Sequence, residues 1–100
     1  MPDFTPFTAT HDREHQRFEV VIDGHACVAD YRRKDGVVTF THTGVPRELQ
    51  GRGIAAELVR QVLAWAEAEG LRVIPACSYV QVYMRRHPQT LGLLAQRGAV

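Results

Sequence analysis

The sequence has few cysteines, no long apolar run and almost no net charge, and each shortage excludes a class of protein. The two cysteines, Cys27 and Cys77, stand fifty positions apart, which is not the cysteine framework of a small secreted domain. No apolar run approaches the roughly 18 residues that a membrane-spanning helix needs. The first residues show no basic stretch followed by an apolar one. We therefore expect no signal peptide, no membrane association and a cytoplasmic location.

Metal-binding spacings are missing as well. The chain contains no CxxC or HExxH pattern, and its histidines are scattered. The one pair at helical ligand spacing, His11 and His15, lies in a polar N-terminal stretch. We expect no metal ion.

The C-terminal third of the chain contains no carboxylate. Residues 70–100 hold Arg72, Arg85, Arg86 and Arg97, whereas the chain as a whole has 12 basic and 11 acidic side chains. Such a segment suits an anion-binding surface, although a short stretch can also lack acids by chance. Four arginines without interleaved aromatic residues do not indicate nucleic acid as a partner.

The first half of the chain has the pattern of an antiparallel sheet. After a loose N-terminal segment, residues 1–11, apolar side chains alternate from Arg17 onward, which predicts a half-buried strand. Asp23-Gly24 favours a tight hairpin turn, and a second strand follows over 25–33. A turn at 34–36 leads into a third strand over 37–45, which Pro46 ends.

The period changes in the second half. Apolar residues recur at intervals of three and four from Ile54 to Trp65, which predicts one amphipathic helix that ends at Gly70. An apolar stretch over 71–80 predicts a strand parallel to the preceding one, because a helix connects the two. A short helix over 82–86 and an apolar tail over 91–95 complete the chain. The fold class is α/β, leaning towards α+β, in a single domain.

The junction between the third strand and the long helix carries the strongest chemical signal. Gly51 and Gly53 leave the backbone open to a ligand, and the first amides of a helix have no internal partner. An anion is stabilised there by the helix dipole, and Arg52 could add a charged donor. The alternative is a tight turn that merely needs two glycines.

Two common phosphate motifs do not fit this junction. The dinucleotide fingerprint requires an acidic residue about twenty positions further on, and no Asp or Glu follows Glu69. A P-loop requires Lys and then Ser or Thr after the second glycine, where this chain has Ile54 and Ala55.

The segment from Val45 through Gln50-Gly51-Arg52-Gly53 to Ala55 resembles motif A of the GCN5-related N-acetyltransferases. The wider chain resembles a short, single-domain branch of that superfamily, the YjdJ-type acetyltransferase-like proteins. The features that carry this resemblance are Phe18-Glu19-Val20, Asp23-Gly24, His42-Thr43, Val45-Pro46, Gln50-Gly51-Arg52-Gly53-Ile54, Pro75-x-Cys77 and Tyr83-x-Arg85-Arg86-His87-Pro88. Gly44 is a departure, because the family usually has a glutamate at this position. The resemblance implies a minimal acetyltransferase domain over 12–97.

The resemblance also implies a cofactor, acetyl-coenzyme A, and the residues that hold it. In the superfamily the strand after the long helix splays from its neighbour and admits the pantetheine arm, which suits Pro75 because proline makes no ladder bond. The expected cofactor-binding residues are Thr43, Val45, Gln50, Gly51, Arg52, Gly53, Ile54, Ala55, Arg85, Arg86 and His87. A backbone amide between Thr43 and Val45 could act as an oxyanion donor to the acetyl carbonyl.

Cys77 and Tyr83 are the candidate catalytic residues. In the resembling family a cysteine at this place lies near the thioester, so Cys77 could accept the acetyl group and pass it on; alternatively it is a small buried hydrophobic residue. Tyr83 falls where the wider superfamily often has a tyrosine that protonates the departing thiolate; alternatively, it packs the helix. We expect Tyr79 to be a packing residue. His87 either contacts a phosphate or bonds the backbone. His42 shares a face with Phe40 in simple alternation, so it lies in the core or lines a cleft.

The function expected from these residues is transfer of acetyl from acetyl-coenzyme A to an amine that the sequence does not identify. The protein would be a monomer or a weak dimer. Two alternatives stay open: a coenzyme A-binding module or sensor without catalysis, and a phosphate-binding domain for another nucleotide.

Overall fold

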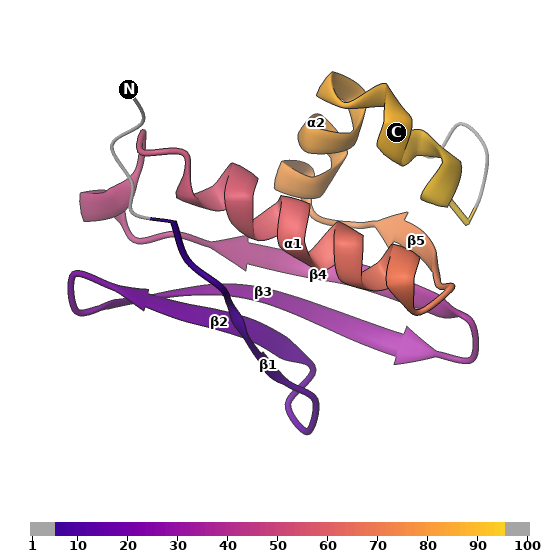
Figure 1. Ribbon diagram of the computed structural model, residues 1–100, viewed down its shortest axis with the longest axis horizontal. Helices are drawn as coiled ribbons and strands as arrows, with labels where there is room; N and C mark the ends of the chain where they lie inside the picture. Colours follow the sequence, from indigo (N-terminus) through magenta and orange to yellow (C-terminus); the bar gives the residue numbers. More distant parts are fainter. Residues whose placement is uncertain (1–5, 96–100) are drawn as a thin grey trace.

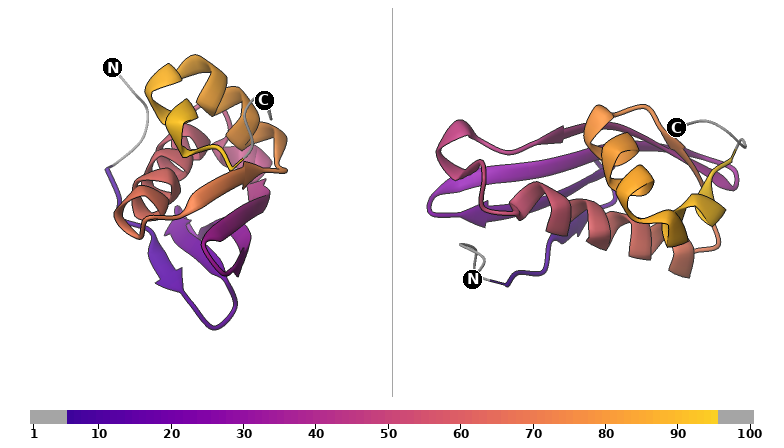
Figure 2. Two further views of the ribbon diagram at one scale, coloured as in Figure 1. Left: turned by 90° about the vertical axis from the view of Figure 1, so that its right-hand side faces the viewer. Right: turned by 90° about the horizontal axis from the view of Figure 1, so that it is seen from above.

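The computed structural model describes residues 6–95, which form one mixed sheet with helices on one face (Figures 1 and 2). The strands are β1 (Thr10–Asp12), β2 (Arg17–Ile22), β3 (His25–Lys34), β4 (Val37–Gly44) and β5 (Arg72–Pro75). The helices are η1 (Arg47–Leu49), α1 (Ile54–Ala68), α2 (Ser78–Arg86) and η2 (Pro88–Leu93). None of the helices in this part of the chain combines the length and apolarity needed to cross a bilayer.

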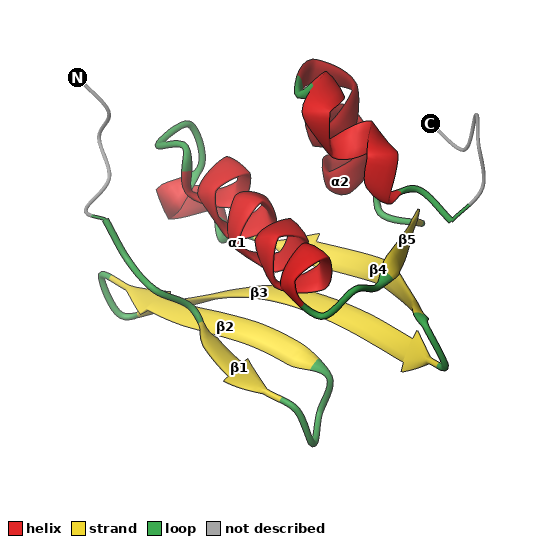
Figure 3. Cartoon of the chain, turned by 45° about the vertical axis from the view of Figure 1, so that its right-hand side comes forward, coloured by secondary structure: helices red, strands yellow, loops and turns green. Residues whose placement is uncertain are grey.

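The sheet confirms the expected fold class. Its strand order is β1-β2-β3-β4-β5; the first four strands pair antiparallel, and β4 pairs parallel with β5 (Figure 3). Helix α1 crosses over the sheet between β4 and β5, as the change of period predicts. The hairpin between β2 and β3 turns at Asp23 and Gly24, which both adopt positive φ, of 51° and 77°.

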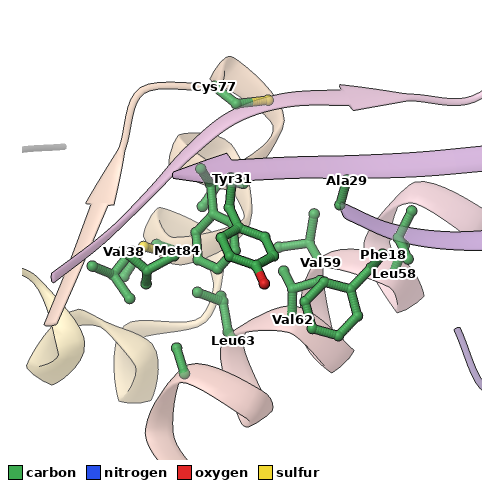
Figure 4. Close-up of a cluster of buried hydrophobic side chains, with 14 of the residues drawn as sticks. Phe18, Ala29, Tyr31, Val38, Leu58, Val59, Val62, Leu63, Cys77 and Met84 are labelled. Atoms are coloured by element: carbon green, nitrogen blue, oxygen red, sulfur yellow. The ribbon is translucent and has the colours of Figure 1, made fainter. Parts of the chain in front are cut away.

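The core lies between α1 and the sheet (Figure 4). Alternation along β3 buries Cys27, Ala29 and Tyr31, and the apolar stripe of α1 covers them. The buried residues of α1 are Ile54, Leu58, Val59, Val62, Leu63 and Ala66. Burying each of the larger side chains stabilises the fold by about 1.5–3 kcal/mol. The helix ends as expected, because Gly70 has a φ of 71° and the Leu71 amide donates to the Ala66 carbonyl at 2.9 Å.

The N-terminal segment contains a strand that the sequence pattern does not predict. β1 pairs with β2, and the His11 ring stacks on Phe18 with a centroid distance of 4.0 Å. The segment before β1 is bonded to α1, since the Gln61 side chain donates to the Phe7 carbonyl and accepts from the Ala9 amide. The boundary expected at residue 12 therefore falls inside β1.

The expected strand over 71–80 is wrong in its second half. β5 ends at Pro75, and α2 begins at Ser78, four residues before the helix start predicted at Val82. Proline cannot donate a ladder hydrogen bond, so the chain leaves the sheet after Pro75. The apolar residues that follow then bury a helical stripe, Val80 and Met84, instead of one face of a strand.

The strands β4 and β5 separate at the point where the prediction places the wedge. Their pairing runs from Val37 opposite Arg72 to Phe40 opposite Pro75. β4 then continues to Gly44, while the segment that follows β5 turns away into α2. One more hydrogen bond connects this segment to β4: the Cys77 amide donates to the Phe40 carbonyl at 2.9 Å.

A β-bulge changes the direction of the side chains in this second half of β4. Asp30 pairs with His42 and Tyr31 pairs with Phe40, so Thr41 is an extra residue in β4. The bulge places His42 on the exposed face and turns Thr43 inward, where it is buried. The assignment of His42 to the face of Phe40 is therefore wrong, because simple alternation does not hold across the bulge.

Candidate functional site

The glycine turn opens α1 without a side-chain cap. η1 is followed by Gly51 and Gly53, which have φ values of 83° and 79°, and Gly53 is the N-cap residue of α1. No side-chain hydrogen bond is made at this cap. Gln50 supports the loop, because its Nε2 donates to the Val45 carbonyl at 3.2 Å. The turn therefore presents the first amides of α1, where an anion is favoured.

A hollow of about 110 Å³ lies against this turn. It is lined by Val45, Leu49, Gln50, Gly51, Gly53, Ile54, Ala55, Ala56 and Tyr79. The structure thus brings six of the expected cofactor-binding residues to one place, from the segment after β4, the turn and the start of α1.

A second hollow, of about 180 Å³, continues from the first between α1 and α2. It is lined by Ala55, Ala56, Val59, Tyr79, Val82, Tyr83 and Arg86. Because the two hollows share Ala55, Ala56 and Tyr79, we treat them as one surface and call it the helix groove. Tyr83 and Arg86 join the expected site through this groove.

Tyr79 is the residue that the sequence analysis assigned to packing. Its side chain is 45% exposed, and it lines both parts of the helix groove. Tyr79 and Tyr83 stand four residues apart, so they lie on the same side of α2. That spacing is the signal that could have placed Tyr79 in the site, but it is visible only if the helix begins before residue 79.

Arg52 is directed towards the neighbouring hairpin. Its Nη1 donates to the Asp23 Oδ2 at 2.9 Å, so the side chain links the glycine turn to the β2–β3 turn. Arg85 is exposed and does not line the helix groove, in contrast to Arg86.

His87 makes the backbone bond that was one of its two expected roles. Its Nδ1 donates to the Tyr83 carbonyl at 2.9 Å, and its ring stacks on Tyr83 with a centroid distance of 3.9 Å. Burial raises the pKa of Tyr83, with Arg60 lowering it and Glu57 raising it by smaller amounts. The Tyr83 hydroxyl therefore keeps its proton at neutral pH and can donate it.

Cys77 lies where β4 and β5 separate, at the margin of the buried cluster (Figure 4). It is the N-cap residue of α2, is 8% exposed, and its Sγ is 3.5 Å from the Thr43 Oγ1, to which the thiol donates. Cys27 is fully buried in the middle of β3, where burial raises the pKa of its thiol. Of the two thiols, only Cys77 adjoins the splayed strands.

The structure does not place the two catalytic candidates in one hollow. Cys77 contacts β4 through Thr43 and Phe40, whereas Tyr83 faces α1 across the helix groove. Within residues 6–95, no group of three His, Cys, Asp or Glu side chains is arranged to hold a metal ion.

Comparison with known proteins agrees with this arrangement. Residues 17–93 match the family described as GCN5-related N-acetyl-transferase. The mouse protein NATD1 (Mus musculus) is 32% identical over 87 residues, which cover 83% of this chain and 78% of the relative. The human protein NATD1 (Homo sapiens) is also 32% identical to this chain over 87 residues, and the match covers 83% of this chain and 76% of the human protein.

A solved structure has the same fold. The NMR solution structure of a GCN5-like protein from Staphylococcus aureus superposes with a TM-score of 0.69 at 21% identity, over 91% of this chain and 92% of the other. The sequence match over most of the chain, the mixed sheet and the glycine turn lead to one conclusion: this chain belongs to the GCN5-related N-acetyltransferase family.

Proposed function

We propose that the protein binds acetyl-coenzyme A and transfers its acetyl group to an amine. The observation that carries the proposal is the helix groove, which begins at the uncapped amides of α1 and extends along α2. Membership of an acetyltransferase family supports the same activity.

The pyrophosphate would bind at the glycine turn. The amides from Gly51 to Ala55 would donate to its oxygens, and the positive end of the α1 dipole would stabilise its charge. Arg86 lines the groove and can pair with a phosphate. Arg52 would supply a donor by giving up part of its contact with Asp23.

The role of Arg85 and His87 as phosphate contacts stays a prediction. Both residues lie at the end of α2, next to Arg86, but neither lines the groove. A phosphate at the far end of the groove would be needed to bring them into contact with the cofactor.

The pantetheine arm would enter between β4 and the start of α2. Within residues 6–95, β4 has no partner strand on the β5 side beyond Phe40, so backbone groups of Thr43 and Gly44 on that side could bond the arm, whereas the Val45 carbonyl already accepts from Gln50. This route leads from the glycine turn to Cys77 and would place the thioester beside Thr43. Tyr83 would contact the cofactor in the groove and act as the proton donor if the thiolate forms within its reach.

Two chemical routes are compatible with this position. In direct transfer the amine attacks the thioester carbonyl, the C–N bond forms, and the C–S bond breaks to release coenzyme A. In the covalent route the Cys77 thiolate attacks first and releases coenzyme A, and the amine then displaces Cys77 from the new thioester. Both routes consume one acetyl-coenzyme A and release one proton from the ammonium form of the acceptor.

Intact-mass measurement after incubation with acetyl-coenzyme A tests the proposal and separates the routes. The covalent route predicts an acetyl adduct of the wild type that is absent in Cys77→Ala and kept in Cys27→Ala. Direct transfer predicts no adduct, but release of coenzyme A when an amine is added. Binding of coenzyme A without an adduct or any turnover across an amine panel would refute the transferase and leave a binding module.

A further inference from the structure

We propose that His42 is the base that removes the proton from the attacking amine. The inference rests on the proposed function, because it assigns a residue that acts on the acceptor of the same reaction. Four features of β4 carry it: the bulge, the open strand edge, the missing side chain at Gly44 and the position of nearby charges.

The bulge at Thr41 exposes His42. Regular alternation from Phe40 would direct residue 42 towards α1 and residue 43 away from it. The register shift between Asp30 and Tyr31 reverses both directions, so the imidazole is exposed and Thr43 is buried. Bulges often re-aim a side chain next to an active site.

His42 precedes Thr43 in β4, and its imidazole lies on the opposite face of the sheet from the position proposed for the acetyl group. Its neighbour in sequence, Thr43, contacts the Cys77 thiol at 3.5 Å on the helix side of the sheet. In the described part of the chain, β4 has no neighbour on the β5 side beyond Phe40, so a ligand can pass from one face of the sheet to the other around this edge. An amine that approaches from the face opposite α1 would therefore pass the imidazole before it reaches an acetyl group held at Thr43.

Gly44 leaves room for the imidazole. A Cβ at position 44 would lie only 2.9 Å from the His42 Nε2, so the ring occupies space that any other residue would take. The His42 ring makes no hydrogen bond or ion pair with residues 6–95, and the residue is exposed. Imidazole is the side chain best suited to accept and release a proton near neutral pH.

The charged groups that share the face of His42 come from β3 and β2. Asp30 lies opposite His42 in β3, but the Arg17 Nε donates to its Oδ1 at 2.6 Å, so this carboxylate is already paired. Glu19 lies one strand further away, opposite Val28. β5 ends at Pro75 and pairs with β4 only as far as Phe40, so it contributes no charged group opposite His42, which we assign as the proton acceptor at this edge.

The step is balanced as follows. The ammonium form of the acceptor gives one proton to His42, and the free amine attacks the acetyl carbonyl to form the C–N bond. The C–S bond then breaks, and the departing thiolate takes the second amine proton, either directly or from Tyr83, which that proton then restores. His42 returns its proton to water, so the net release is one proton for each acetyl group transferred.

The test compares His42→Gln, Gly44→Ala and the double variant with the wild type. The acceptors are an alkylamine, which is protonated at pH 7, and an arylamine, which is not. We expect His42→Gln to lower kcat for the alkylamine about a hundredfold, with an unchanged KM for acetyl-coenzyme A and a far smaller loss with the arylamine. On its own, Gly44→Ala should displace the imidazole and lower the rate with the alkylamine. Combined with His42→Gln, it should cause no further loss of that rate.

His25→Gln, which changes a histidine at the start of β3, is the matched control and should keep full activity. Three results would overturn the role of His42 but leave the proposed function standing. They are equal losses with both amines, full alkylamine activity in His42→Gln, and additive effects of the His42 and Gly44 substitutions. A wild type that binds coenzyme A but acetylates no amine would overturn the proposed function and this inference together.

Discussion

At the scale of single residues, Tyr79 shows that the position of a helix start decides whether a side chain packs in the core or lines the candidate site. The sequence pattern places residues 71–80 in a strand, where Tyr79 would be one of many apolar residues. The structure places it in the first turn of α2, 45% exposed, at the middle of the helix groove. A partly exposed aromatic ring between two hollows can cover a ligand without being needed by the core.

We therefore predict that Tyr79→Ala weakens coenzyme A binding about tenfold and changes the Tm little, because the ring contributes to ligand burial more than to the core. Titration calorimetry and a thermal melt measure the two effects. Val21→Ala is the control, since Val21 is 64% exposed on the sheet face opposite α1. A Tm drop as large as that of a core truncation, with unchanged affinity, would return Tyr79 to a packing role.

At the scale of elements, β1 depends on an aromatic cluster formed by residues far apart in the sequence. The His11 ring stacks on Phe18 and meets Trp65 edge-on at a centroid distance of 4.9 Å. Its Nε2 lies 2.6 Å from the Tyr31 hydroxyl. A three-residue strand carries no alternation of its own, so the sequence pattern could not show it.

This cluster predicts a pH dependence of stability. Burial lowers the pKa of His11 in the folded state, with smaller contributions from nearby charges. The unfolded chain therefore binds this proton more readily, so the stabilisation is complete above about pH 6.5 and is lost as the pH falls through the folded pKa. We expect the Tm to fall by a few degrees between pH 7 and pH 5, and less in His11→Phe, which keeps the stacked ring.

Thermal melts across this pH range check the prediction. His25→Gln should keep the wild-type dependence, because His25 lies outside the cluster. The same dependence in His11→Phe as in the wild type would show that another group carries it.

At the scale of the whole molecule, local patterns were enough for β2, β3, β4 and α1, but not for β1, the end of β5 or the geometry between elements. Alternation placed Cys27 and Tyr31 in the core, and the change of period at Ile54 placed α1. The glycine turn and the order of the shared motifs indicated the family. The bulge at Thr41 carries no local signal, so the exposure of His42 could not be predicted.

The same limit applies to the geometry of the candidate site. Five residues that are close in sequence gather at one hollow: Gln50, Gly51, Gly53, Ile54 and Ala55. Cys77 and Tyr83 lie six positions apart and separate to two sides of α2, because the helix begins earlier than its pattern suggests. Their separation follows from helix geometry and could be deduced only once the start of α2 was known.

The central claim is that the glycine turn binds the pyrophosphate of coenzyme A, and calorimetric titration of Gly53→Val tests it most directly. Gly70→Val is the matched control, because Gly53 and Gly70 have similar φ values, 79° and 71°, at opposite ends of α1, so valine strains both turns alike. The account predicts a comparable fall in Tm for the two variants, but a loss of at least about a hundredfold in affinity for coenzyme A in Gly53→Val alone. Wild-type affinity in a folded Gly53→Val protein, or equal losses in both variants, would contradict it.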